Sequence, residues 1–61
     1  MLDYETKVML RDVEDFTDID YIVDCLEDEE LKEELQNYAY VYYYKKKTAK
    51  EIAQLFLEDY Q

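Results

Sequence analysis

The sequence contains no glycine, no proline and no histidine. Without glycine it has no phosphate-cradling loop and no dinucleotide-binding fingerprint, and tight hairpins and positive-φ turns become unfavourable. Without histidine it has no imidazole base, no Ser-His or Cys-His nucleophile pair and no ordinary zinc site. These absences exclude most classes of enzyme, so we expect a protein that is not an enzyme and uses no cofactor or metal.

Cysteine and long apolar runs are also scarce. Cys25 is the only cysteine, so the chain cannot form an internal disulfide. Together with the lack of a signal-peptide pattern in the first residues, this favours a reducing, cytoplasmic location. No apolar run approaches the roughly 20 residues of a membrane-spanning helix. Because Cys25 lies beside Ile22 and Leu26 in helical projection, we expect it to be a small buried hydrophobic residue.

Charge of one sign dominates the chain, whose 61 residues carry a net charge of -10. Positions 1–36 hold fourteen acidic and three basic residues, a net charge of -11, whereas positions 37–61 hold three acidic and four basic residues. Even the second part is therefore no basic patch, and we expect no direct binding of nucleic acid. Self-repulsion in so small a domain also makes an aromatic core, a homodimer or a bound partner a reasonable expectation.

Apolar residues recur at helical spacing along most of the chain and predict one all-α domain spanning residues 1–61. The expected architecture is a small bundle of three helices at 18–27, 29–46 and 49–60, or of four if residues 4–15 are also helical. Thr17 is the expected N-cap of the helix at 18–27. Thr48 and Glu51 have the spacing of a capping box for the helix at 49–60. Lysines at 45–47 would complement the dipole of the preceding helix.

Two segments also fit strands, at residues 4–10 and 38–44. The second is rich in tyrosine and valine, which favour pleated surfaces, and its tyrosines partly alternate. An α+β fold is therefore the alternative. Five tyrosines within seven residues (38, 40, 42, 43 and 44) cannot all be buried by one helix, so some must be exposed or meet a partner. Tyr40 and Tyr43 are the candidates for such contacts.

Carboxylates are interleaved with the apolar stripe between residues 12 and 34. On a helix, carboxylates at i and i+4 are about 6 Å apart, a spacing comparable with that of phosphates along a nucleic acid strand. Such rows suit a groove lined with Lys and Arg, although a solvated surface that keeps a small protein soluble is the plainer interpretation. The candidate partner-binding carboxylates are Asp20, Asp24, Glu27, Asp28, Glu30, Glu33 and Glu34.

Three partial motifs carry less weight. The segment at 46–56 resembles the first helix of a helix-turn-helix unit, but no basic recognition helix follows it. Glu29, Glu30 and Glu33 match the EExxE string of all-α nucleotide pyrophosphohydrolases, yet the second acidic element of that family is missing. Asp18, Asp20 and Asp24 lack the glycine and the non-helical frame of a calcium loop.

In size, helicity and acidic rows, the chain resembles the small DNA-mimic inhibitors that phages and mobile elements carry. The resemblance implies a non-enzymatic inhibitor that binds the basic groove of a nucleic-acid-binding host protein, such as a nuclease, a CRISPR effector, or a restriction or repair enzyme. The alternative is a small regulatory or adaptor protein. It would dimerise or dock on a partner through its tyrosine-rich helix and the apolar stripe of residues 49–60.

Overall fold

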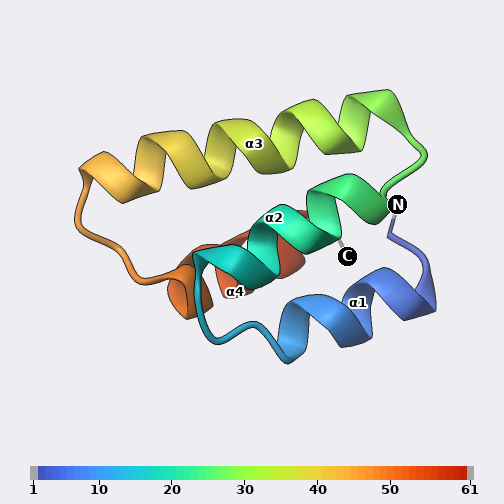
Figure 1. The fold of residues 1–61 in the computed structure, drawn as a ribbon, viewed down its shortest axis with the longest axis horizontal. Helices are drawn as coiled ribbons and strands as arrows, with labels where there is room; N and C mark the ends of the chain where they lie inside the picture. The colour runs from blue at the N-terminus through green and yellow to red at the C-terminus, as the bar shows by residue number, and fades with distance from the viewer. Residues whose placement is uncertain (1, 61) are drawn as a thin grey trace.

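The computed structural model describes residues 2–60, which form four α-helices (Figure 1). The helices are α1 (Tyr4–Arg11), α2 (Phe16–Cys25), α3 (Glu29–Tyr44) and α4 (Ala49–Tyr60). The predicted all-helical fold is confirmed, with the optional fourth helix present. Residues 4–10 and 38–44 are helical, and no strand occurs between residues 2 and 60, so the α+β alternative is wrong.

Acidic side chains cap the first three helices, and two of the observed helix boundaries differ from the predicted ones. The helix expected at 18–27 begins at Phe16 because its N-cap is Asp15, not Thr17. The Asp15 carboxylate accepts a hydrogen bond from the Asp18 amide (3.2 Å), and the Asp18 carboxylate accepts one from the Asp15 amide (3.3 Å). This reciprocal capping box satisfies two amides that otherwise lack helical partners. The first helix ends at Arg11, short of the expected residue 15.

The remaining caps follow the same chemistry. Asp3 accepts a hydrogen bond from the Thr6 amide (2.8 Å) at the start of α1. Hydrogen bonding with the Thr6 side chain, and then with its amide, lowers the pKa of Asp3. The predicted capping box of α4 is confirmed: the Glu51 amide donates to Thr48 Oγ1 (3.2 Å), and the Thr48 amide donates to Glu51 Oε1 (3.0 Å). Hydrogen bonding to the Thr48 amide lowers the pKa of Glu51.

The turn between α3 and α4 shows how the chain manages without glycine. Lys46 has a φ of 65°, the one positive φ among residues 2–60. Its amide donates to the carbonyl of Tyr43 (3.1 Å), and the next amide, of Lys47, donates to the carbonyl of Tyr42 (3.0 Å). This is the Schellman pattern, which usually places glycine at the left-handed position. A lysine therefore occupies a backbone conformation that glycine would adopt with less strain.

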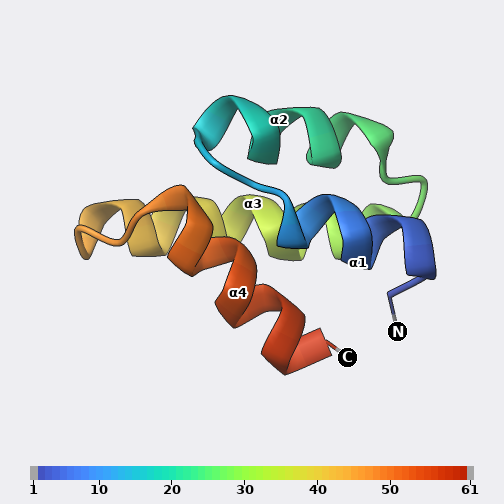
Figure 2. The same ribbon diagram turned by 90° about the horizontal axis from the view of Figure 1, so that it is seen from below.

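The helices form a bundle in which α1 and α3 lie on opposite sides in one view (Figure 1) and α2 and α4 lie on opposite sides in the view turned by 90° (Figure 2). Consecutive helices run in opposite directions, so the starts of α1 and α3 and the ends of α2 and α4 meet at one end of the molecule (Figure 1). Helix α4 contacts each of the other three. Its inward face carries five of the core side chains: Ala49, Ile52, Ala53, Phe56 and Leu57. None of the helices within residues 2–60 is long and apolar enough to cross a membrane.

Candidate functional site

The exposed side of α2 carries the first two predicted carboxylates. Ile19, Ile22 and Val23 face the core, so Asp20 and Asp24 project into solvent. Because they are four residues apart on one helix, their Cβ atoms are separated by about 6 Å. We call this pair the acidic flank. The structure therefore forms the i, i+4 carboxylate pair expected from the sequence.

The acidic flank continues into the connection between α2 and α3. Glu27 is exposed there, and Asp28 is the N-cap of α3. The Asp28 carboxylate accepts hydrogen bonds from the amides of Glu30 (2.9 Å) and Leu31 (3.3 Å). Asp28 thus holds the start of α3 in place, while its side chain stays exposed.

The three predicted carboxylates of α3 do not form one surface. Glu30 and Glu33 are exposed, whereas Glu34 is half-buried and accepts a hydrogen bond from the Tyr60 hydroxyl of α4 (2.8 Å). Consecutive helical residues point about 100° apart, so Glu33 projects well away from the side of α3 that faces α4. The predicted row is therefore divided between an outward surface and a contact within the domain.

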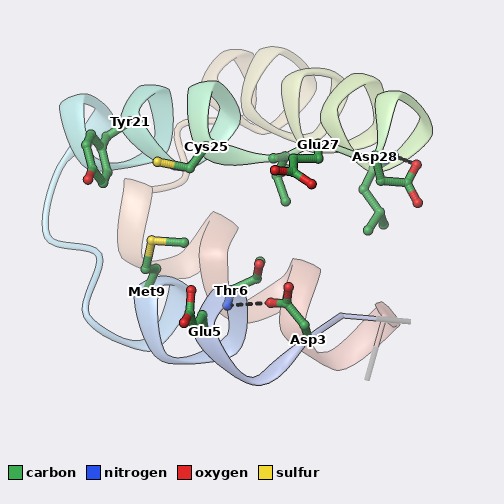
Figure 3. A pocket seen from close by; sticks show the side chains of 10 residues that line it. Asp3, Glu5, Thr6, Met9, Tyr21, Cys25, Glu27 and Asp28 are labelled. Carbon is green, nitrogen blue, oxygen red and sulfur yellow. Dashed lines mark hydrogen bonds between the residues drawn. The ribbon is translucent and has the colours of Figure 1, made fainter.

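A groove of about 550 Å³ opens beside the α2–α3 connection (Figure 3). Asp3 and Glu5 lie on one side of this opening and Glu27 and Asp28 on the other (Figure 3). The full lining consists of Asp3, Glu5, Thr6, Met9, Tyr21, Cys25, Leu26, Glu27, Asp28 and Leu31. The groove combines an acidic rim with the apolar surface of a methionine and two leucines. We call this region, together with the acidic flank, the acidic end.

Most of the groove could not be found from the sequence, because it depends on where α1 packs. Cys25 is exposed and lines it, so the prediction of a buried cysteine is wrong. The core stripe of α2 passes through Ile22 and Leu26, and Cys25 lies at its edge, on the same side as Tyr21 one turn earlier. Hydrogen bonding with Cys25 raises the pKa of the Tyr21 hydroxyl. In helical projection, Tyr21 and Cys25 both lie outside the apolar stripe of α2. This position was the signal in the sequence that could have predicted their exposure.

Three of the five tyrosines of α3 are exposed and two are half-buried, as expected because five tyrosines within seven residues cannot all be buried by one helix. Tyr40, Tyr43 and Tyr44 are 66%, 61% and 67% exposed, and we call them the tyrosine surface. Their rings meet edge to face, with centroids 5.1 Å apart for Tyr40–Tyr44 and 5.9 Å for Tyr43–Tyr44. Tyr43 also contacts Phe16 of α2 at 5.6 Å. Both predicted contact tyrosines are therefore accessible to a partner.

Tyr38 and Tyr60 instead join α3 to α4, in a contact that we call the α3–α4 seam. The Tyr38 hydroxyl donates a hydrogen bond to Asp59, and the Tyr60 hydroxyl donates one to Glu34. These carboxylates favour the protonated hydroxyls, so the pKa values of both tyrosines are raised. The Phe56 ring packs against Tyr38 (5.1 Å) and stacks on Tyr60 (4.4 Å).

The apolar stripe of residues 49–60 lies inside the domain. Its largest members, Ile52, Phe56 and Leu57, are at most 2% exposed. They pack against other helices of the same chain, so they offer no docking surface in this fold. Of the two surfaces expected for an adaptor, only the tyrosine-rich helix is accessible.

Within residues 2–60, no three acidic or cysteine side chains are arranged to hold a metal ion. The chain matches no protein-family model, no curated protein and no solved structure at a significant level. The functional assignment therefore rests on the geometry of the acidic end and of the tyrosine surface.

Proposed function

We propose that this protein is a non-enzymatic inhibitor that occupies the basic, nucleic-acid-binding groove of another protein. The observation that carries the proposal is the acidic end. There, exposed carboxylates from the start of α1 and from the α2–α3 connection line one groove, and the exposed Asp20 and Asp24 lie on α2, which precedes that connection. The candidate targets are nucleases, CRISPR effectors, and restriction or repair enzymes, as the resemblance to DNA-mimic inhibitors suggests.

Electrostatics supports this partner class over others. The net charge of -10 gives the protein a long-range attraction toward basic surfaces, which accelerates association and weakens as salt is added. Asp20 and Asp24 sit on a helix, so their spacing is fixed before binding and little ordering entropy is lost. A preformed carboxylate pair can replace two phosphates in contacts with Lys or Arg.

The groove adds a contact that phosphates alone would not provide. A lysine or arginine side chain has an aliphatic stem and a cationic head. Leu26 and Leu31 supply apolar surface for the stem, and Glu5 and Glu27 supply carboxylates for the head. We expect one basic side chain of the target to enter this groove.

The test is displacement of a fluorescent DNA duplex from a panel of purified nucleases, restriction enzymes and repair enzymes. The wild-type protein should release the duplex from its target, and its affinity should fall as salt rises. The double variant Asp20→Lys/Asp24→Lys should bind at least about tenfold more weakly. Glu14→Lys/Glu58→Lys changes the net charge equally at exposed positions outside the acidic end and should bind more tightly than the α2 variant.

Two results would contradict the proposal. One is binding that does not respond to salt. The other is an α2 double variant that inhibits as well as the wild type while circular dichroism shows an unchanged fold.

A second candidate function is that of a small adaptor or regulatory protein that docks on a partner through the tyrosine surface. Its support is the exposure of three neighbouring tyrosines, a residue type enriched at protein interfaces. Replacing Tyr40 and Tyr43 with Ser should abolish partner binding in this case. It should leave the displacement of DNA by the acidic end intact.

A further inference from the structure

The outer face of α3 has two chemically different halves. Glu29 and Glu33 occupy its first half, Asn37 lies at its middle, and Tyr40 and Tyr44 occupy its second half; all five side chains are exposed. Their spacing of three or four residues places them on one side of the helix. Leu35, at the opposite side, is completely buried. The exposed Lys46 and Lys47 follow beyond the end of α3, next to the aromatic half of this face, whereas the Lys45 ammonium lies over the Tyr42 ring, 5.4 Å from its centroid.

We propose that two copies of the chain associate through this face in an antiparallel arrangement with two-fold symmetry. In an interface of this symmetry, each contact occurs twice. Glu33 of one copy would lie opposite Tyr40 of the other, and Glu29 opposite Tyr44 and the lysines. Positions 36 and 37 would lie next to the two-fold axis. The proposal is independent of the inhibitor function, because it uses α3 and requires no target protein.

Charge complementarity determines the orientation. An antiparallel pair places the lysines of each copy beside the glutamates of the other, and it also aligns the helix dipoles favourably. A parallel pair would place Glu29 and Glu33 of both copies together. The 16 residues of α3 span about 24 Å. The two acidic ends would therefore be separated by more than the Debye length of about 8 Å at physiological ionic strength.

The size of the face indicates a weak dimer. A strip about 24 Å long and about 10 Å wide is smaller than the roughly 800 Å² per partner of a standard interface. The tyrosines offset part of this deficit, since their rings provide large, rigid contact area at low entropic cost. We therefore expect association at micromolar concentrations and a monomer at lower concentrations.

Cross-linking at the axis tests the arrangement directly. In a Cys25→Ser background, Asn37→Cys should give a covalent dimer with a short bismaleimide reagent, because the two thiols would face each other. The matched control is Gln54→Cys in the same background, at an exposed position on α4. It should give little cross-linked product. Equal cross-linking of both variants would overturn the proposal, since random collisions would then explain the product.

Sedimentation of the full chain gives the second test. Tyr40→Ser/Tyr44→Ser should raise the dissociation constant of the dimer at least about tenfold. Tyr4→Ser/Tyr21→Ser removes two equally exposed tyrosines from α1 and α2 and should leave it unchanged. A wild-type chain that stays monomeric from micromolar to millimolar concentration would overturn the proposal. So would a dimer that is lost only in the control variant.

Discussion

The acidic flank of α2 and the α3–α4 seam are both rich in carboxylates, yet they have different physical roles. Asp20 and Asp24 are exposed to solvent on the outer side of α2. Glu34 and Asp59 accept hydrogen bonds from tyrosine hydroxyls of the facing helix. The first pair adds like-charge repulsion to the folded state, whereas the second pair links two helices.

The difference shows that the residue type alone does not decide whether a carboxylate is free to bind a partner. Glu33 and Glu34 are adjacent and chemically identical, but only Glu34 faces α4 and meets Tyr60. A binding surface should be sought among exposed carboxylates that form no hydrogen bond to another helix of the fold. Four substitutions, in order of decreasing expected effect on stability, test this difference between the acidic flank and the seam.

Phe56→Ala should break the seam. Phe56 is fully buried and packs against the rings of Tyr38 and Tyr60. Truncation of a buried phenylalanine costs about 3–5 kcal/mol, which is comparable with the total stability of a domain of this size. We expect the variant to be largely unfolded by circular dichroism. Tyr4→Ala, at a residue that is 77% exposed, is the control and should unfold at the same urea concentration as the wild type.

Tyr38→Phe should weaken the seam but keep its packing. The variant keeps the ring contact with Phe56 but loses the hydrogen bond to Asp59. A hydrogen bond to a charged group contributes about 1.5–3 kcal/mol and a typical one about 0.5–1.5 kcal/mol. Because this bond is exposed to solvent, we expect a loss of about 1–2 kcal/mol in the free energy of unfolding from urea titration. No change would mean that the Tyr38 hydroxyl is as well satisfied by water as by Asp59.

The effect of Tyr38→Phe on stability should also depend on pH. The pKa of Tyr38 is raised in the folded protein above its ordinary value of 10.0. Its contribution to stability is therefore fully present below pH 10 and is lost as the pH rises beyond that value. The stability difference between the wild type and Tyr38→Phe should shrink above pH 10. A difference that stays constant into the alkaline range would contradict this assignment. Tyr4→Phe serves as the exposed control.

Lys46→Gly should stabilise the turn that leads from the tyrosine surface into α4. Lys46 adopts a φ of 65°, where glycine has no Cβ strain. The gain is reduced by the greater freedom of glycine in the unfolded chain, so we expect about 0.5–1 kcal/mol in the free energy of unfolding. The matched control is Lys45→Gly, since Lys45 has a φ of -86°. It should destabilise the protein.

Asp24→Asn should have the smallest effect and the opposite sign from the seam variants. It relieves repulsion with Asp20 and removes a negative charge from the last turn of α2, where the helix dipole disfavours anions. We expect a gain of about 0.2–0.5 kcal/mol in thermal or urea unfolding. Glu34→Gln, which weakens a bond to Tyr60, should lose stability instead. A loss of stability in both variants would remove the distinction between the flank and the seam.

Part of this fold could be predicted because its causes are local. The apolar period set the helices, and Thr48 and Glu51 are close enough in sequence to form the predicted capping box. The start of α2 was predicted wrongly because Asp15 and Thr17 are both good N-caps. The reciprocal bonds between Asp15 and Asp18 decided in favour of Asp15. The groove was missed because its two sides come from α1 and from the α2–α3 connection.

The helical class, the excess of negative charge and the need to expose some of the tyrosines follow from composition and from residues within one or two turns of each other, so they can be predicted from the sequence. The packing of the helices, in contrast, selects which carboxylates remain exposed and which tyrosines contact the core. That choice depends on which helix packs against which side of α3. Hydrogen bonds such as Tyr60–Glu34, between residues 26 positions apart, form only after the helices have packed.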